Sequence, residues 1–470
     1  MKQPQTLIAA AVLAVCANAS ATDDVTKRVD EVFKDWARTD SPGCSVAVAQ
    51  DGNIVLERAY GMADLEQGVA VRPDTVFNIA SVSKQFTAVA LLLLQEQGKL
   101  SLDDDVRKYV IELPDYGTRI TLRHLANHTS GLRDLPEVLG LAGWNWVDAV
   151  EPAYALEMIS RQRHLNFTPG SKYSYSNSGY YLMAVIVERV SGQRFSEFTR
   201  DHIFKPLGML HSRFYDDRRL IMKNRAVGHV KLPEGGFGVW RPTYEIVGDG
   251  ALLTTVQDLA LWERNFLYPK LGRNPQQLMT DMTQSGVLTD GKKIDYGLGL
   301  AVGEYRGLPI VSHGGGIPGF NTFMLRFPEQ RFASIVFCNV GGGPARVAAK
   351  AVADIFLDGK FTKGPEAPEP RPEPNHLTKA EHQPGAKQLN KFAGVYYSEE
   401  LDTRYTLKVV GEQLAVSVGH VPAMPLYAVD GRRFYNEDLE LAVTFSGNGF
   451  DVQAGEIHGL RFERVARRID

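Results

Sequence analysis

The residues of this sequence best suited to chemistry are Ser81 and Lys84, which lie in the stretch 78–87 just before the apolar run 88–94. Residues three apart share one face of a helix, so the hydroxyl and the amine can meet. A desolvated lysine with a lowered pKa can accept the proton of a serine, and free N–H groups at a helix N-terminus can stabilise an oxyanion. The pair therefore indicates a serine nucleophile with a lysine base, although an N-cap serine followed by a solvated lysine fits the same residues.

Two later groups of residues complete a possible acyl-transfer site. Tyr175-Ser-Asn177 lies in a polar, turn-rich loop that leads into an apolar helix, and His313-Gly-Gly315 ends a predicted strand. Acyl transfer needs a nucleophile, a base, a proton donor for the leaving group and an oxyanion cradle. The three groups in this order favour catalysis over the N-cap interpretation.

Together the three groups resemble the motifs of the penicillin-recognising serine hydrolases, specifically the class C β-lactamase-like group. That group includes β-lactamases, D-alanyl-D-alanine carboxypeptidases, D-aminopeptidases and esterases. The likeness covers about residues 25–358 and includes the stretches 128–132, 175–180, 206–209 and 296–299. It implies an α+β fold of the β-lactamase/transpeptidase type, in which helices flank an antiparallel sheet beside an all-helical region.

The resemblance also implies a role for each motif residue. Ser81 is the expected acylated nucleophile, Lys84 helps to deprotonate it, and Tyr175 shuttles protons between Ser81, the leaving group and water. Tyrosine titrates near pH ~10 when unperturbed, so it acts as a base only beside a cation such as Lys84 or in a concerted transfer.

The substrate is expected to lie between Asn177 and the strand that carries His313. Asn177 would hold the substrate amide and orient Lys84, and the small residues 314–316, Gly315 among them, would let the substrate lie against the strand edge. Backbone N–H groups of Ser81 and Gly316 would form the oxyanion hole.

His313 departs from the family pattern, because penicillin-type members usually carry lysine at this position. A histidine attracts a substrate carboxylate less reliably at pH 7. We therefore expect a D-amino-acid-containing peptide or amide, or a small ester, as substrate. A true β-lactamase, a D-Ala-D-Ala carboxypeptidase and a non-catalytic penicillin-binding-like sensor remain alternatives, as does a His313 that only bonds to backbone.

The length and composition predict several domains. The chain has 470 residues, 44% of them hydrophobic and 23% charged, which is ordinary for a globular protein. We predict a hydrolase domain at 22–358, a Pro/Glu-rich linker at 359–388, and a small β-barrel or sandwich domain at 389–470. Strands are expected at 43–50 and 53–60, joined by an Asp-Gly turn, and at 296–302.

The first 21 residues read as a cleavable signal peptide, with Lys2, a short apolar run and Ala19-Ser-Ala21. We therefore expect a periplasmic or secreted protein. Cys44 and Cys338 lie in predicted strands and could form a disulfide, but we expect buried free thiols.

Other functions are not expected. A net charge of −3 offers no basic field for nucleic acid, and no later segment reads as a membrane span. His124 and His128 have helical spacing but lack a third ligand, so no metal is expected. Residues 314–319 match Gly-x-Gly-x-x-Gly without the required helix, so no nucleotide is expected. The expected partner is a small-molecule or peptide substrate, with no cofactor and no prediction of oligomeric state.

Overall fold

A six-stranded antiparallel sheet forms the centre of the larger part of the molecule. The computed structural model describes residues 23–146, 148–241, 244–366 and 377–465. The strand order is β10-β11-β12-β13-β1-β2. Their bounds are β1 (Cys44–Gln50), β2 (Asn53–Tyr60), β10 (Ala301–Tyr305), β11 (Leu308–Ile317), β12 (Phe320–Phe327) and β13 (Phe332–Cys338). The N-terminal hairpin β1–β2 thus forms one edge of a sheet whose other strands are C-terminal, with β1 paired to β13.

Helices cover both faces of this sheet. A helix over residues 23–32 and α11 (Ala345–Phe356) bury their apolar sides against one face, in a cluster that includes Val29, Val48 and Val352. The other face packs against α9 (Val256–Leu267) and α2 (Lys84–Glu96), in a cluster that includes Ala47 and Phe86. The sheet is therefore buried on both sides, which explains why β13 is buried throughout and apolar except at Ser334.

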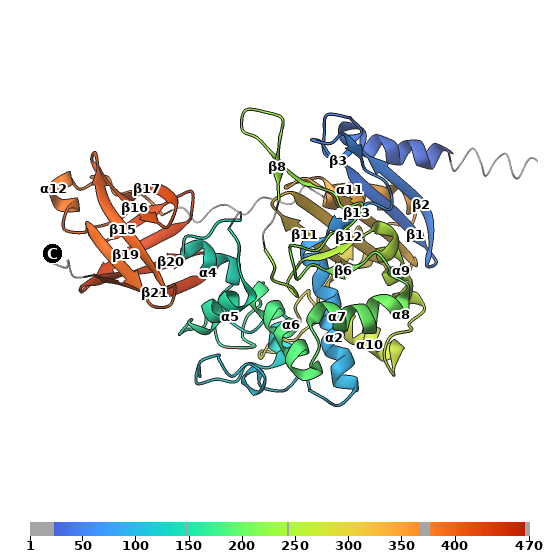
Figure 1. Ribbon diagram of the computed structural model, residues 1–470, viewed down its shortest axis with the longest axis horizontal. Coiled ribbons are helices and arrows are strands. Elements are labelled where there is room, and N and C mark those ends of the chain that lie inside the picture. The colour runs from blue at the N-terminus through green and yellow to red at the C-terminus, as the bar shows by residue number, and fades with distance from the viewer. Residues whose placement is uncertain (1–22, 147, 242–243, 367–376, 466–470) are drawn as a thin grey trace, which may run out of the picture.

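The remaining helices form the predicted all-helical region (Figure 1). They are α3 (Leu122–Ala126), α4 (Leu135–Leu141), α5 (Pro152–Ser160), α6 (Asn177–Ser191), α7 (Phe195–Thr199), α8 (Lys205–Leu207) and α10 (Pro275–Thr283). Short 3-10 turns are η1 (Lys34–Trp36), which follows the N-terminal helix, η2 (Ala80–Ser83) and η3 (Val106–Lys108), and η4 (Arg200–Phe204) is a short π-helix. Helix α2 is buried from Lys84 to Leu94 because it contacts α6, α7 and α10 as well as its own turn η2. It therefore lies between the helical region and the sheet.

Short strands complete this part of the chain. They are β3 (Met62–Asp64), β4 (Val69–Ala70), β5 (Phe77–Asn78), β6 (Arg213–Phe214), β7 (Gly228–Lys231), β8 (Phe237–Trp240) and β9 (Leu252–Thr254). β9 pairs with both β5 and β6. Because β5 directly precedes η2, this pairing fixes the entry to α2. The predicted strand at 296–302 is wrong for its first half, since β10 begins only at Ala301.

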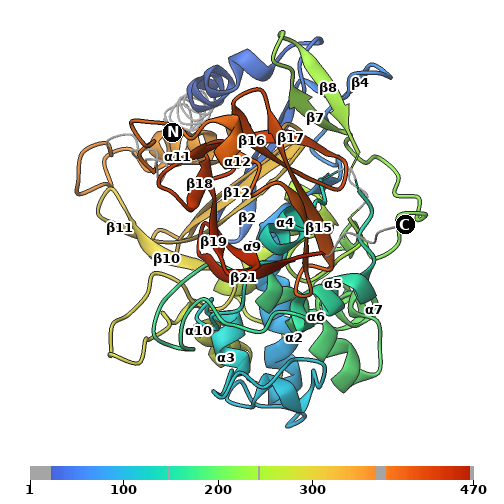
Figure 2. The same ribbon diagram turned by 90° about the vertical axis from the view of Figure 1, so that its left-hand side faces the viewer.

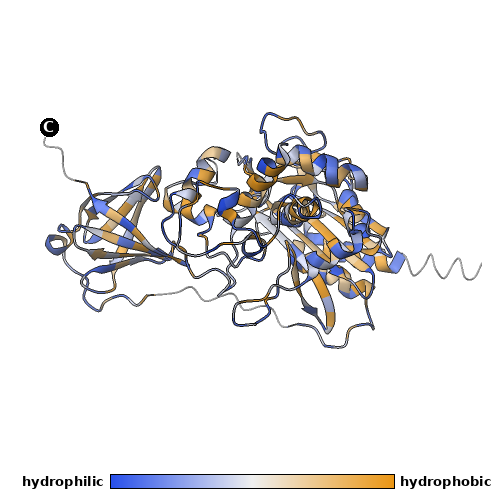
Figure 3. Cartoon of the chain, turned by 90° about the horizontal axis from the view of Figure 1, so that it is seen from below, coloured by the Kyte–Doolittle hydropathy of each residue, from blue (hydrophilic) through white to orange (hydrophobic). Residues whose placement is uncertain are grey.

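The C-terminal part is a closed eight-stranded barrel, as expected for a small β domain. It contains α12 (Ala386–Leu389), β14 (Gly394–Ser398), β15 (Thr403–Val410), β16 (Gln413–Val418), β17 (Val421–Ala428), β18 (Arg433–Asn436), β19 (Leu441–Ser446), β20 (Gly449–Ala454) and β21 (Ile457–Arg464). Buried and exposed residues alternate along β15, and Figure 3 shows this alternation of hydropathy along the barrel strands.

The barrel lies beside the helical region (Figures 1 and 2). Its apolar core belongs to the same continuous cluster of buried side chains as the core around α2. The Arg133 guanidinium donates to Glu400 at 2.8 Å and to the His458 carbonyl at 2.7 Å, and both side chains of this ion pair are buried. The Tyr405 hydroxyl donates to the Leu141 carbonyl at 2.8 Å. The barrel is thus held by polar as well as apolar contacts.

Cys44 and Cys338 form a disulfide bond, so the expectation of free thiols is wrong. The two residues face each other in the β1–β13 register, and their Cα atoms are 4.1 Å apart. The pairing of β1 with β13 therefore brings the thiols together.

Two sequence predictions lie partly or wholly outside the described residues. The signal peptide at 1–21 lies outside them, and so does the middle of the linker, at 367–376. The domain boundaries at 22, 358 and 389 stay predictions. Within the described ranges, every helix is too short or too polar to span a bilayer.

Candidate active site

Ser81 lies in η2, one residue beyond a strained position. Ala80 has a φ of 47°, in the left-handed region that few residues other than glycine adopt, and its N–H donates to the Asn78 side chain at 2.9 Å. Such a conformation costs of the order of 1–3 kcal/mol and persists only where its surroundings enforce it. The local backbone thus holds Ser81 at the sharp entry to α2.

Lys84 is the first residue of α2 and is completely buried. Its Nζ donates to Ser81 Oγ at 3.0 Å, to Asn177 Oδ1 at 2.8 Å and to the Asp249 carbonyl oxygen at 2.5 Å. Three acceptors around one ammonium fix the direction of each bond. The structure therefore brings together three of the predicted site residues, Ser81, Lys84 and Asn177, through one amine.

The electrostatics of Lys84 suit a base. Burial lowers the pKa of Lys84 to about 8, while the charges of Asp249 and Asp134 oppose that change. Burial raises the pKa of Asp249 to about 6, and the Lys84 charge opposes the rise. Burial also raises the pKa of Asp134, against hydrogen bonds from the Asn177 backbone and side chain. An amine with this lowered pKa is neutral in a useful fraction of molecules near neutral pH.

Asn177 opens helix α6 and is fixed at both ends of its amide. Its backbone N–H and its Nδ2 both donate to the Asp134 carboxylate, the latter at 3.2 Å, and its Oδ1 accepts from Lys84. The amide therefore has a defined orientation and holds the Lys84 ammonium toward Ser81.

Tyr175 stands over Lys84 from the loop before α6. Lys84 Nζ is 4.9 Å from the centre of the Tyr175 ring. Burial raises the pKa of Tyr175, while a hydrogen bond with Ser81 opposes the rise. The phenol is therefore protonated at neutral pH and suited to donate a proton. Lys84, with its lowered pKa, is the better resting base of the two.

The His128 ring stacks against the Tyr175 ring and supports it. The two rings are stacked with centres 4.2 Å apart, and His128 Nδ1 accepts from the Ser176 N–H at 3.0 Å. His128 is buried, has a φ of 57°, and has its pKa lowered well below the usual value by burial. It is a neutral support for the Tyr175 backbone and ring. His124 accepts from the Thr121 N–H at the start of α3, so the two histidines serve separate local structures.

His313 is held inside the sheet and not at its end, because β11 continues to Ile317. Its Nδ1 donates to the Gly314 carbonyl at 2.7 Å, and its Nε2 accepts from the Tyr296 hydroxyl at 2.9 Å, since a carbonyl can only accept. Burial, aided by the Lys84 charge, lowers the pKa of His313 to about 3. His313 is therefore neutral and lines the cavity as an uncharged group.

Gly315 allows β11 to lie directly against the nucleophile turn. A Cβ at Gly315 would lie 2.2 Å from the Ile79 carbonyl oxygen and 2.4 Å from Thr322 Oγ1. Only glycine fits this approach. The next residue, Gly316, borders the same cavity as Ser81, where the predicted oxyanion hole requires its N–H.

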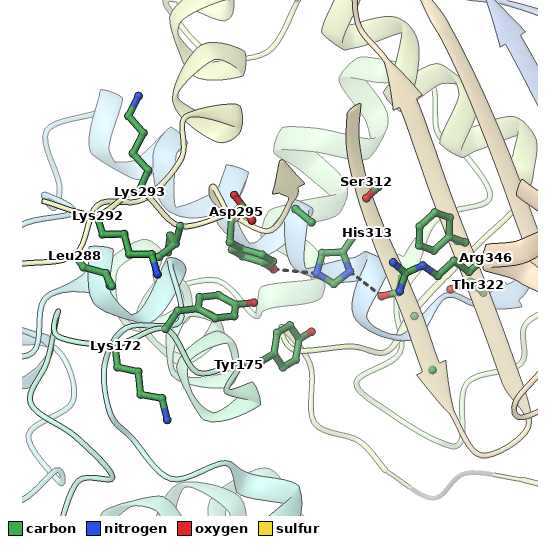
Figure 4. Close-up of a pocket in the computed structure, with 18 of the residues that line it drawn as sticks. Lys172, Tyr175, Leu288, Lys292, Lys293, Asp295, Ser312, His313, Thr322 and Arg346 are labelled. Carbon is green, nitrogen blue, oxygen red and sulfur yellow. Dashed lines mark hydrogen bonds between the residues drawn. The ribbon is translucent and has the colours of Figure 1, made fainter. Parts of the chain in front are cut away.

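Two cavities meet at this site. The larger, of about 980 Å³, is lined by Tyr175 and His313 and by lysines, and Figure 4 shows Tyr175 beside His313, with ring centres 6.3 Å apart. The smaller, of about 240 Å³, is lined by Ser81 and by aromatic side chains. Tyr175 and Gly316 border both. A substrate across Ser81 can thus place its leaving group in one cavity and its acyl part in the other.

The sequence interpretation did not identify the second layer of the site. Asp134, Asp249, His128 and Tyr296 hold or face the predicted residues. His128 and Tyr296 stand in stretches that carried the family resemblance, which was a usable signal. Asp134 and Asp249 are single acids in turns, where no periodicity distinguishes them. Within the described residues, no cluster of three or more His, Cys, Asp or Glu could hold a metal ion.

Comparisons with known proteins agree with this geometry. The family model described as Beta-lactamase matches residues 28–357. Penicillin-binding protein 4* of Bacillus subtilis (strain 168) is 28% identical over 448 residues, which cover 89% of this chain and 93% of that protein. A D-aminopeptidase of Gluconobacter oxydans (strain 621H) is 30% identical over 339 residues, which cover 70% of this chain but only 63% of that enzyme.

A solved structure shares the whole architecture. The octameric penicillin-binding protein homologue from Pyrococcus abyssi aligns with a TM-score of 0.64 at 24% identity, over 94% of this chain and 99% of that chain. This likeness concerns the fold alone, and it covers the barrel as well as the larger part of the molecule.

Proposed function

Because the chain belongs to the beta-lactamase family and is a serine hydrolase, we propose that it cleaves amides through an acyl-enzyme at Ser81. The observation that carries this proposal is the bond of 3.0 Å between Ser81 Oγ and the amine of the fully buried Lys84. A hydroxyl next to a desolvated amine is the pairing that nucleophilic catalysis by serine requires.

Acylation begins when neutral Lys84 accepts the Ser81 proton and Ser81 Oγ attacks the substrate carbonyl carbon. The resulting oxyanion is held by the backbone N–H groups of Ser81 and Gly316. Tyr175 gives its phenolic proton to the leaving nitrogen as the C–N bond breaks, and it regains a proton from Lys84. The amine product leaves, and the acyl group stays on Ser81 as an ester.

Deacylation repeats these steps with water as the nucleophile. The Lys84–Tyr175 pair accepts a proton from water, the hydroxide attacks the ester carbonyl, and the departing Ser81 alkoxide is reprotonated. One water is consumed for each amide cleaved, and a carboxylic acid is released. Asn177 keeps Lys84 directed at Ser81 throughout, because its other end is fixed by Asp134.

The proposed substrate is an amide or short peptide of a D-amino acid. The likeness to a D-aminopeptidase supports this class. The neutral His313 supports it too, because lysine-containing members use a cation there for a substrate carboxylate and this chain offers an uncharged imidazole. Substrates of β-lactamases and of D-Ala-D-Ala carboxypeptidases carry such a carboxylate, and this site offers no cation at His313 to bind it.

Export to the periplasm or the medium belongs to the same proposal. Residues 1–21 have the charge, apolar run and small-residue end of a signal peptide. The Cys44–Cys338 bond adds support, since disulfides persist in oxidising compartments. Cell fractionation with N-terminal sequencing of the mature protein tests this, and an uncleaved protein in the cytoplasm would contradict it.

Intact-mass spectrometry tests the catalytic proposal. The mature protein and a Ser81→Ala variant are incubated separately with a fluorophosphonate, a D-amino-acid amide and a penicillin. We expect a Ser81-dependent phosphonate adduct, turnover of the amide and no stable penicillin adduct. A long-lived penicillin adduct without amide turnover would instead indicate a penicillin-binding peptidase or sensor.

A further inference from the structure

Asp249 carries a buried carboxylate oxygen that none of the described residues satisfies. The residue is 6% exposed, and its Oδ1 has no hydrogen-bond partner within the part of the chain that the structure describes. Its Oδ2 accepts from the Tyr244 hydroxyl at 3.2 Å, and Lys84 meets the residue at the main-chain carbonyl. An acceptor left unpaired in the interior costs about 1–3 kcal/mol, and more if charged. A group from outside the protein is therefore expected to bind there.

The surroundings of Asp249 select a cation. The residue borders the cavity of about 240 Å³ next to Ser81, and among the described residues that line this cavity it is the only acid. The walls include Trp146, Trp240 and Tyr244. Aromatic faces and a carboxylate together attract an ammonium group and repel a carboxylate.

The charges around Lys84 point the same way. Asp134 and Asp249 both act on this one ammonium, so two carboxylates face one buried cation. Burial raises the pKa of Asp249 only to about 6, so its carboxylate is largely ionised at neutral pH. An incoming ammonium would balance the excess negative charge, whereas a neutral ligand would leave it uncompensated.

We propose that Asp249 binds the free ammonium group of the acyl part of the substrate, so that the enzyme selects amides and peptides with an unblocked amino terminus. The proposal rests on the function proposed above and adds the group that the substrate must carry. Asp249 and Ser81 both contact Lys84, through a carbonyl oxygen and a hydroxyl. An ammonium at Asp249 is therefore close to the carbonyl that Ser81 attacks, as it is in an α-amino acid.

Two matched substrates test this selection. D-Phenylalanine p-nitroanilide carries the amine, and 3-phenylpropionic p-nitroanilide lacks it but has the same ring and leaving group. The readout is the ratio of their kcat/KM values. Any effect of the variant on the basicity of Lys84 changes both kcat/KM values by the same factor, so it cancels in the ratio. We expect a ratio of about 100 or more in the wild type and a fall of at least about tenfold in Asp249→Asn, since a charged hydrogen-bond partner is worth about 1.5–3 kcal/mol.

Asp295→Asn is the matched control, because Asp295 is an acid that lines the larger cavity. Its ratio should equal that of the wild type. An unchanged ratio in Asp249→Asn, or a ratio near one in the wild type, would overturn the proposal. A fall confined to Asp295→Asn would place the ammonium in the other cavity and overturn it as well.

A binding measurement separates this proposal from the catalytic one. Protection of Ser81 from fluorophosphonate labelling is compared for D-phenylalanine amide and 3-phenylpropionamide. If neither anilide is cleaved but the amine protects at least about tenfold better and loses this advantage in Asp249→Asn, the ammonium site stands while the hydrolase proposal fails. Equal protection by both ligands would overturn the ammonium site whatever the catalytic result.

Discussion

Replacing Glu400 by glutamine should destabilise the larger part of the molecule, although Glu400 belongs to the barrel region. Glu400 Oε2 accepts from Arg133 at 2.8 Å and from the Arg163 N–H at 2.8 Å. The side chains of Arg133 and Glu400 are 1% and 6% exposed. Without the carboxylate, a buried guanidinium would keep only neutral acceptors, Gln162 Oε1 and the His458 carbonyl.

The magnitude follows from the burial of this pair. Removing one partner of a buried ion pair costs about 3–5 kcal/mol. The neighbouring Glu399 offers a control, because its pair with Arg163 has side chains that are 67% and 63% exposed. Exposed pairs contribute about 0–1 kcal/mol, so Glu399→Gln should change little.

Urea unfolding followed by tryptophan fluorescence measures the effect. All five tryptophans lie at or before Trp262, so the signal reports the part of the chain that carries Ser81 and not the barrel. We expect a clearly lower midpoint for Glu400→Gln. We also expect lower activity, because the Arg133 carbonyl accepts from Ser178 Oγ at 2.6 Å and its neighbour Asp134 fixes Asn177. Equal midpoints for the two variants would refute the reasoning.

Three further predictions follow from the site. With a substrate that has no amine, kcat/KM should rise with pH through about 8, because Lys84 must be neutral to accept a proton and its pKa is lowered to about 8. A pH profile of kcat/KM that is flat across this range would contradict the role of Lys84 as the base. Gly315→Ala should reduce kcat strongly and cost about 1–3 kcal/mol in urea unfolding, because its Cβ would displace the Ile79 carbonyl; wild-type kinetics would exclude the close approach of β11. Glu456→Gln should lower kcat several-fold while changing the unfolding free energy by less than about 1 kcal/mol, because Glu456 pairs with Lys172 at 2.5 Å and accepts from Ser174 next to Tyr175. Glu412→Gln, elsewhere on the barrel, is the control. An equal kcat in the two variants would refute this role for Glu456.

Local signals were enough to predict the main elements. The Asp-Gly turn gave the β1–β2 hairpin, and the apolar run 88–94 gave the buried body of α2. The first part of the strand predicted at 296–302 is wrong because tertiary packing decides that segment. A Cβ at Gly299 would lie 2.6 Å from the Gln85 Cα, so this stretch is a loop pressed against the start of α2. The hydrophobic periodicity of the sequence does not reveal such a contact.

The parts of the site that the sequence could predict are those with fixed spacing or family motifs. Ser81 and Lys84 are three residues apart, and their contact follows from helix geometry. Asp249 lies 165 residues from Lys84, and its bond to that amine depends on how β9 returns beside η2. The choice between a disulfide and free thiols could not be made from the sequence for the same reason, since Cys44 and Cys338 meet only through the pairing of β1 with β13.

The most direct test of the central claim is rapid-quench intact-mass spectrometry of the protein during turnover of a D-amino-acid amide or ester. We predict a transient increase in mass equal to the acyl group, located by peptide mapping at Ser81, absent in Ser81→Ala and decaying at the rate of steady-state turnover. Turnover that persists in Ser81→Ala, or an acyl group on any other residue, would contradict the account.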